Sequence, residues 1–196
     1  MTLKTAVRAL LATIVLAAIT GLLYPLAMTG VAQVAFGTKA NGSLVDVHGR
    51  PAGSAMIGQA WSGPDWFHGR PSADGYDASA SAGSNLGPTS ATLSEEIHQR
   101  IAAVLKREGP YQPGLTAADV PADLVTASAS GLDPDISVAS ALLQAPRIAA
   151  VRGIALAQVR QLIDAHTSSK ELGFLGELRV NVLELNLALE QMAPRG

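Results

Sequence analysis

Two carboxylates that lie two positions apart, Asp133 and Asp135, form the pair in this sequence that is best suited to acid–base chemistry. They flank Pro134 and follow the hydroxyl-rich stretch 128–131. Two carboxyl groups in a cleft can take a proton from a substrate and return it. A structural role is favoured, because Asp-Pro sequences form turns and Ser137 is suited to cap the helix that follows.

A second stretch with catalytic residue types is Gly-Ser-Asn-Leu-Gly at residues 83–87. It comes closest to the Gly-x-Ser-x-Gly elbow of hydrolases, but Ser84 stands one position too early. Its glycines are compatible with a nest of backbone amides for an anion, although a tight turn is favoured. The sequence has no Gly-x-x-x-x-Gly-Lys-Ser/Thr phosphate loop and no cysteine, which excludes disulfides and cysteine nucleophiles.

The four histidines, His48, His68, His98 and His166, lie far apart and form no His-x-x-x-His pair. Zinc sites usually combine ligands at such short spacing. His98 is expected on the polar face of a helix. We therefore predict no catalytic residue, no cofactor-binding residue and no metal ligand in this chain.

Charge is distributed unevenly along the 196 residues. Residues 9–38 carry none, whereas residues 40–196 carry 11 of the 14 basic and all 16 acidic side chains, a net charge of −5. A nucleic-acid-binding protein needs a basic surface to neutralise phosphates. The composition therefore argues against a nucleic-acid partner.

The uncharged segment predicts a single transmembrane helix over about residues 9–31, because roughly 20 apolar residues cross a bilayer. A cleaved signal peptide, with residues 30–32 as its cleavage site, is the main alternative, and a buried helix of a soluble core is another. The length of the apolar run favours an uncleaved anchor. The sequence thus predicts a tip and anchor at residues 1–39 and an outer domain at residues 40–196.

The basic residues that flank the anchor predict its orientation. Lys4 and Arg8 precede it, whereas only Lys39 follows closely, and basic residues stay on the cytoplasmic side. The N-terminus is therefore expected in the cytoplasm, with the outer domain on the periplasmic or extracytoplasmic side of a cell inner (plasma) membrane. Pro25 should kink the helix and Gly21 permits close approach of another helix, features that suit docking but are also common in membrane helices.

Residues 53–90 are expected to form an ordered loop region. Gly, Ser and Pro make up 17 of these 38 residues, which argues against helices and strands. The same segment holds four of the eight aromatic residues of the chain, whereas a disordered linker would have few. They are Trp61, Trp66, Phe67 and Tyr76.

Patterns after this loop region predict helices and strands of one α/β (mixed α+β) domain. We expect a helix over about 92–108, capped by Thr92 with Glu95, and a short strand at 124–128. A further helix begins after Ser137, with a kink or new start at Pro146. The last elements are a helix from Leu156 to about His166 and a strand that runs into a terminal helix within 180–189.

Blocks along most of the chain, from about residue 20 to 190, resemble the C subunit of the Kdp-type potassium-transporting P-type ATPases. The blocks occur in one order, and the ordered set is far more specific than any single block. They cover residues 20–26, 53–59, 67–73, 76–78, 83–89, 120–128, 131–134, 144–149, 173–177 and 179–189. The sequence departs from the family pattern at Ala129, Asp135 and Leu178, where Gly, His and Pro are usual.

The resemblance implies a non-catalytic accessory subunit of an ATP-driven potassium import complex, needed for assembly and for stimulation of ATP hydrolysis. Its expected partners are a channel-like potassium-binding subunit, an ATP-hydrolysing P-type subunit and the membrane. The complex would use ATP, Mg²⁺ and K⁺, with no cofactor assigned to this chain. The family is described as raising the ATP affinity of the catalytic subunit, which conflicts with a domain outside the cytoplasm.

A different class of function remains open from the residues alone. A membrane-anchored extracytoplasmic enzyme or ligand-binding domain would use the loop region 53–90, and substitution of Asp133 or Ser84 would abolish its activity. An accessory subunit would tolerate those substitutions.

Overall fold

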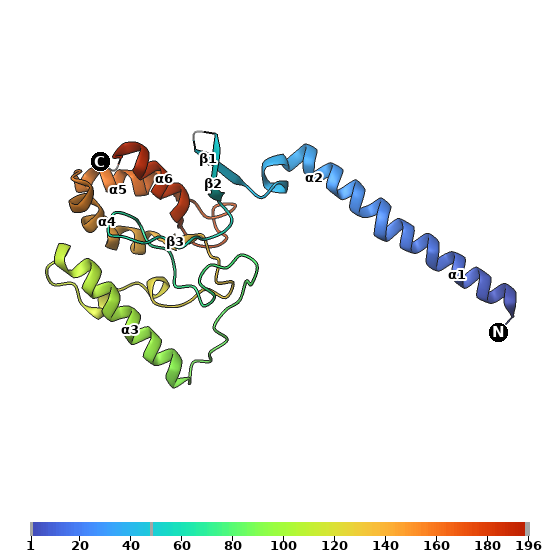
Figure 1. Ribbon diagram of the computed structural model, residues 1–196, viewed down its shortest axis with the longest axis horizontal. Coiled ribbons are helices and arrows are strands. Elements are labelled where there is room, and N and C mark those ends of the chain that lie inside the picture. The colour runs from blue at the N-terminus through green and yellow to red at the C-terminus, as the bar shows by residue number, and fades with distance from the viewer. Residues whose placement is uncertain (1, 48, 195–196) are drawn as a thin grey trace. The chain divides into compact units, whose positions relative to one another are not determined.

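The computed structural model of the chain describes residues 2–47 and 49–194. It divides into two compact units, residues 1–52 and residues 53–196. One long apolar helix at the N-terminus and a mixture of helices and small sheets in the remainder confirm the predicted fold class, an α/β domain on a single helix (Figure 1).

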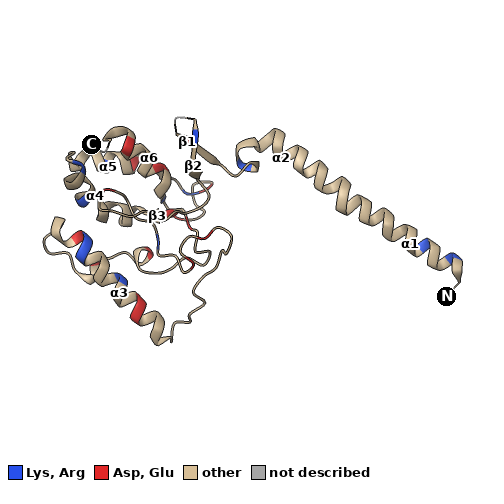
Figure 2. Cartoon of the chain, in the orientation of Figure 1, with Lys and Arg blue, Asp and Glu red and all other residues tan. Residues whose placement is uncertain are grey.

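The N-terminal helix runs from Leu3 to Ala40 and is the one candidate membrane span among the described residues. It comprises α1 (Leu3–Ala18), a π-helical segment (Ile19–Leu23) and α2 (Tyr24–Ala40), and none of its residues is buried. Charged side chains lie only near its two ends (Figure 2). An apolar helix of this length with no buried residue and no charge over residues 9–38 is suited to an apolar environment such as a bilayer.

The π-helical segment lies directly before Pro25. The Tyr24 amide donates to the carbonyl of Ile19, five residues back, so the backbone turn is wider there than in an α-helix. Proline has no amide hydrogen and its ring collides with the preceding turn, and the wide turn makes room for that ring. A second irregularity lies at Phe36, where the backbone angles leave the helical region. The hairpin β1 (Leu44–Val47) and β2 (Arg50–Ser54) follows.

In the second unit the helices surround a small antiparallel sheet of order β3-β5-β4. Its strands are β3 (Asp135–Ser137), β4 (Thr167–Ser168) and β5 (Arg179–Asn181). The helices are α3 (Ala91–Glu108), α4 (Val138–Arg152), α5 (Leu156–Ala165) and α6 (Val182–Met192), with short 3₁₀ turns at Gly109–Tyr111, Ala117–Asp119 and Ala122–Leu124. Figure 1 shows α4, α5 and α6 grouped together, with α3 along another side.

Two apolar clusters hold this unit together. The larger lies between the sheet and α4, α5 and α6, and takes in Phe67 from the loop region. The smaller lies under α3 and is built from Val104, Leu124, Val125 and Leu143. The amide and carbonyl of Phe67 both bond to the side chain of Asn186 at 2.9 Å, which ties the loop region to α6.

The helices predicted at 92–108 and at 156–166, and the strand that leads into a terminal helix, are confirmed. The cap of α3 was predicted one half-turn too late, because the hydroxyl of Ser90, rather than Thr92, accepts the amide hydrogen of Leu93. Ser137 caps α4 as predicted, accepting from the amide of Ser140 at 3.1 Å.

The predicted strand at 124–128 is wrong. The segment begins in a 3₁₀ turn, and the Thr126 amide and hydroxyl both donate to the carbonyl of Ala122, at 2.9 and 2.7 Å. Leu124 and Val125 are buried under α3, so their apolar character reflects packing rather than strand pairing.

Of the kink or new helix start predicted at Pro146, the new start is wrong, because α4 continues through this residue. The carbonyl four residues earlier, in Leu142, loses the amide that proline lacks, but Leu142 is exposed and water can reach it. The next carbonyl along the helix, that of Leu143, accepts a hydrogen bond from the Gln112 side chain at 2.6 Å.

Candidate functional site

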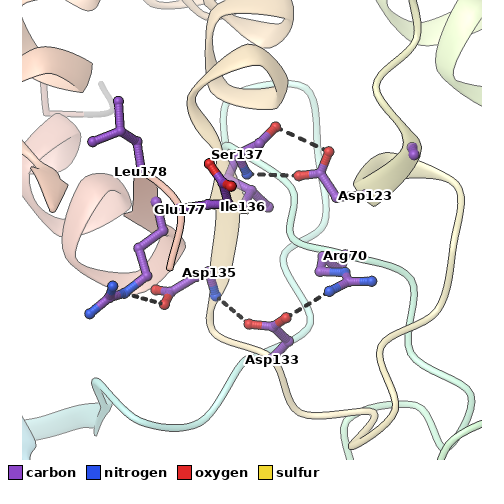
Figure 3. Close-up of a pocket in the computed structure, with 10 residues that line it drawn as sticks. Arg70, Asp123, Asp133, Asp135, Ile136, Ser137, Glu177 and Leu178 are labelled. Atoms are coloured by element: carbon purple, nitrogen blue, oxygen red, sulfur yellow. Dashed lines mark hydrogen bonds and ion pairs between the residues drawn. The ribbon is translucent and has the colours of Figure 1, made fainter. Parts of the chain in front are cut away.

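An open groove of about 490 Å³ lies at one end of the small sheet (Figure 3). Four segments line it: the loop region, the turn after Val120, the turn and strand around β3, and the segment that leads into β5. The lining residues are Arg70, Ala122, Asp123, Asp133, Asp135, Ile136, Ser137, Glu177, Leu178 and Arg179. Antiparallel pairing sets Ser137 opposite Arg179, which brings β3 and β5 together at the groove.

Asp133 is committed to structural bonds within the groove. One carboxylate oxygen pairs with the Arg70 guanidinium at 2.9 Å, and the other accepts the amide hydrogen of Asp135 at 3.0 Å. The second bond closes a turn of the kind that Asp-Pro sequences favour. The geometry therefore agrees with the structural interpretation of this pair.

Asp135 is also paired. Its carboxylate meets the Arg179 guanidinium at 3.2 Å and accepts from the Asn181 amide group at 3.3 Å. Partial burial raises the pKa of Asp135, and the nearby charge of Asp133 adds to that increase, while Arg179 opposes it. This carboxyl group is therefore held by Arg179 and Asn181.

Asp123 extends the same pattern at the N-terminus of α4. It accepts from the amide and hydroxyl of Ser137, at 2.7 and 3.1 Å, and from the hydroxyl of Ser140 at 2.7 Å. A carboxylate beside the first turn of a helix is stabilised by the amides exposed there. The groove wall formed by Asp123 and Ser137 is therefore fixed in place, as Figure 3 shows.

Arg70 is positioned from behind by Tyr76, whose hydroxyl donates to the Arg70 carbonyl. Burial raises the pKa of the Tyr76 phenol, so it remains a hydrogen-bond donor at neutral pH. Gly58 lies beside the Tyr76 ring and the Asp133 carbonyl, and its amide donates to the Leu132 carbonyl at 2.8 Å. A side chain at this glycine would collide with the Asp133 carbonyl, which explains why the loop can approach the turn only with glycine there.

A buried ionic cluster that the sequence analysis missed lies beneath α3 and α4. The Arg147 side chain donates from Nε to both carboxylate oxygens of Glu108, at 3.0 and 3.1 Å, and from Nη2 to Gln144 at 3.0 Å. It also donates to the carbonyls of Pro64 and Trp66 in the loop region. The sequence did hold a signal for this cluster, because Arg147 stands among the apolar residues that form the buried face of α4. A charged residue at a buried position needs a partner of opposite charge.

The histidines do not come together. His68 lies beside the buried cluster, where its Nε2 is 2.8 Å from the Gly63 carbonyl, and burial together with the charge of Arg107 lowers its pKa to about 4. His98 is exposed on α3, and Nδ1 of His166 lies 2.9 Å from the carbonyl of its own helix at position 162. His48 lies outside the described residues.

The remaining candidates also lie apart from the groove. Ser84 is exposed and does not line it, and Asn85 has a positive φ of 54°, as in a tight turn. In the part of the chain that the structure describes, no group of three or more His, Cys, Asp or Glu side chains is arranged to hold a metal ion.

The groove has the properties of a recognition surface. Its carboxylates outnumber its guanidinium groups by four to two, and Asp123, Asp133 and Asp135 are held by the bonds described above. Glu177 projects from the rim with its side chain 90% exposed, and its carboxylate pairs with Lys170 at 3.6 Å. An excess of fixed carboxylates at a groove attracts cationic groups.

Comparison with known proteins finds relatives that match most of the chain. Residues 6–191 match the family described as KdpC, the K⁺-transporting ATPase c chain. The potassium-transporting ATPase KdpC subunit of Gemmatimonas aurantiaca is 52% identical over 188 residues, covering 94% of this chain and 92% of the relative. The subunit of the same name from Acidobacterium capsulatum is 54% identical over 186 residues, covering 94% and 96%.

A third relative, the KdpC subunit of Mycobacterium tuberculosis, is 52% identical over 181 residues, covering 91% of this chain and 94% of its own. The matches take in the N-terminal helix and the groove residues alike. This chain belongs to the KdpC family, the c chain of the K⁺-transporting ATPase.

Proposed function

We propose that this chain is a membrane-anchored accessory subunit that assembles with a channel-like potassium-binding subunit and an ATP-hydrolysing P-type subunit. The observation that carries this proposal is the helix Leu3–Ala40, which is uncharged over residues 9–38, has no buried residue and is joined to a folded domain of the family. Such a helix is stable in a bilayer, where it can also pack against helices of partner subunits.

The anchor contributes to assembly in this proposal, beyond holding the domain at the membrane. The wide turn before Pro25 leaves fewer backbone hydrogen bonds within the helix at that point. In a bilayer, side chains of neighbouring helices can supply the missing donors, and Gly21 lets such a helix approach closely.

The domain lies outside the cytoplasm in the proposed orientation, with the N-terminus inside. Lys4 and Arg8 on one side of the span against Lys39 on the other favour this orientation. The subunit then influences ATP hydrolysis through its contacts with partner subunits rather than by touching cytoplasmic nucleotide. The paired state of the groove carboxylates fits this role better than that of an extracytoplasmic enzyme.

Purification of the partner subunits with and without this chain tests the proposal. We expect the complex to lose integrity, and its potassium-stimulated ATP hydrolysis to fall, when the chain is omitted. Intact assembly with unchanged potassium-stimulated hydrolysis would contradict the proposal.

A matched variant separates anchoring from docking. Residues 3–40 are replaced by an unrelated single-span helix of the same length and orientation. We expect the chimera to reach the membrane but to co-purify poorly with the partner subunits, because the helix packing surface is lost. Co-purification equal to that of the natural chain would show that the anchor only tethers the domain.

A further inference from the structure

An ordered loop before β5, residues 170–178, presents large apolar side chains to solvent. The exposed fractions are 83% for Leu172, 71% for Phe174, and 48% each for Leu175 and Leu178. Single exposed apolar residues are common on protein surfaces, but a cluster within one short loop marks an interaction site. We call this segment the apolar loop.

The apolar loop is held in one conformation by its own backbone. Glu171 and Leu175 exchange two amide-to-carbonyl bonds of 2.9 Å each, and the Gly173 amide donates to Lys170 at 3.0 Å. Leu172 adopts a positive φ of 52°, a conformation that leucine rarely takes. Bonds that enforce this conformation at an exposed leucine preorganise the loop, which lowers the entropy cost of binding.

The apolar loop is continuous with the acidic groove. Glu177 and Leu178 end the loop and also line the groove, as the labelled side chains in Figure 3 show. The groove carries four carboxylates and two guanidinium groups, and Glu177, although paired with Lys170 at 3.6 Å, keeps 90% of its side chain exposed to solvent. A partner that covers the loop must therefore meet negative charge at its edge, which calls for a basic side chain there.

The same surface lies close to the point where the chain enters this unit. β5 follows the apolar loop directly, and at its end the Asn181 side chain donates to the carbonyl of Ala55 at 2.8 Å. Ala55 comes two residues after Gly53, the first residue of the unit after the membrane-anchored segment. Through β5, the apolar loop is therefore tied to the segment at which this unit begins.

We propose that the apolar loop and the adjoining acidic groove form one docking surface for an extracytoplasmic protein segment of a partner subunit. The segment presents apolar side chains that cover Leu172 and Phe174, next to a Lys or Arg that enters the groove beside Glu177. The inference rests on the proposed function, since it assigns a surface to that assembly.

A lipid surface fits these residues less well. Interfacial loops that bind membranes combine apolar side chains with Lys and Arg, which attract anionic headgroups. Here the lysine of the loop, Lys170, is paired with Glu177 at 3.6 Å, Glu171 is paired with Arg179 at 3.1 Å, and the groove beside the loop has four carboxylates against two guanidinium groups. Anionic headgroups would be repelled by this arrangement, whereas a basic protein segment would be attracted.

Single cysteines test the inference, because the natural sequence has none to interfere. Leu172→Cys and Phe174→Cys are made separately in the full chain, so that each variant keeps the other apolar side chains. Ala102→Cys, on an exposed position of α3, is the matched control. The probe is a membrane-impermeant maleimide, and the measurement is its labelling rate in the purified complex and in the free chain, in detergent and in nanodiscs.

We expect Cys at position 172 or 174 to react about tenfold more slowly in the complex than in the free chain, because a packed interface core excludes solvent. Labelling at position 102 should not change. Equal rates in complex and free chain at both loop positions would overturn the inference. Protection of the free chain in nanodiscs alone would identify lipid as the occupant, and protection of the free chain in detergent would identify a second copy. Either result would also overturn it.

A charge-reversal pair tests the acidic edge. Glu177→Lys should reduce the amount of chain recovered with the complex about tenfold at low salt, with a smaller effect at high salt, because the interaction is electrostatic. Glu95→Lys, on exposed α3, should leave recovery unchanged. Normal recovery of Glu177→Lys would contradict the assigned basic contact. Failure of the natural chain itself to co-purify would instead overturn the proposed function, so the two failures are distinguishable.

Discussion

The charged side chains of Glu108 and Arg147 are both fully buried in the domain. Burial of a lone charge is costly, whereas a pair with further hydrogen bonds is tolerated. Arg147 meets this condition because it bonds to Glu108, to Gln144 and to backbone carbonyls of the loop region. It therefore joins α3, α4 and the loop region at one point.

Replacement of Arg147 should be among the most destabilising changes in the domain. Arg147→Ala removes one of the two guanidinium groups that pair with the buried Glu108 carboxylate and leaves only Arg107, at 2.8 Å, so we expect it to cost about 3 kcal/mol in the free energy of unfolding. Denaturant unfolding of the full chain in detergent, followed by the fluorescence of Trp61 and Trp66, measures this change. Arg160→Ala, at an exposed position of α5, is the control and should have little effect. A loss below about 1 kcal/mol for Arg147→Ala would contradict the assigned role.

His68 should make the stability of the domain depend on pH. Burial, with a further contribution from the charge of Arg107, lowers its pKa from 6.5 to about 4 in the folded state. Between these values the unfolded chain binds a proton that the folded chain does not. Stability is therefore complete above pH 6.5 and falls as the pH decreases toward 4, by on the order of 2 kcal/mol.

Unfolding of the natural chain and of His68→Gln between pH 4 and 7 checks this dependence. The variant should show a flatter profile in that range, whereas His98→Gln, at an exposed position, should keep the natural slope. Equal slopes for the natural chain and for His68→Gln would show that other groups control the response.

At the scale of single elements, the structure places the cap of α3 at Ser90 and not at Thr92, the one cap predicted from the sequence. Thr92 and Glu95 have the spacing of a capping box, but the Ser90 hydroxyl makes the bond to the helix. Both serine and threonine are good caps, and only the path of the preceding loop decides which of them reaches the first turn.

Ser90→Ala should reduce the free energy of unfolding by about 1 kcal/mol, because the Leu93 amide loses its acceptor. Thr92→Ala lies inside the first turn and should change stability by less than about 0.5 kcal/mol. Thermal or denaturant unfolding of the two variants measures the difference. The opposite ranking would restore Thr92 as the cap.

The incorrect predictions at this scale share a cause. The strand predicted at 124–128 is replaced by a 3₁₀ turn because burial of Leu124 and Val125 under α3 outweighs the strand preference of its residues. The new helix start, one of the two alternatives predicted at Pro146, does not occur because packing on both sides of α4 holds the helix together across one missing bond. Local preference is weak compared with tertiary contacts in both segments.

At the scale of the whole molecule, the orientation of the anchor decides what the domain can touch. A reporter fused after residue 196 should be active only on the extracytoplasmic side if Lys4 and Arg8 keep the N-terminus inside. The double variant Lys4→Gln, Arg8→Gln removes this bias and should increase the fraction of inverted chains. A cytoplasmic reporter on the natural chain would contradict the orientation and would permit direct contact with nucleotide.

The sequence alone was sufficient for the membrane helix, the mixed α/β domain, the main helices and the family. These depend on the length of an uncharged run, on the spacing of apolar residues and on the order of the family's sequence blocks, all of which are visible in the linear sequence. The apolar character of residues such as Leu172 was visible there too, but not whether they were buried.

Only the tertiary structure showed the groove, the buried pair of Glu108 and Arg147, and the exposed apolar loop. Each depends on contacts between segments far apart in sequence: Arg70 reaches Asp133, Arg147 reaches Glu108, and Asn181 reaches Ala55. Whether a charge is paired or an apolar side chain is covered follows from the packing of those segments, which no local pattern contains.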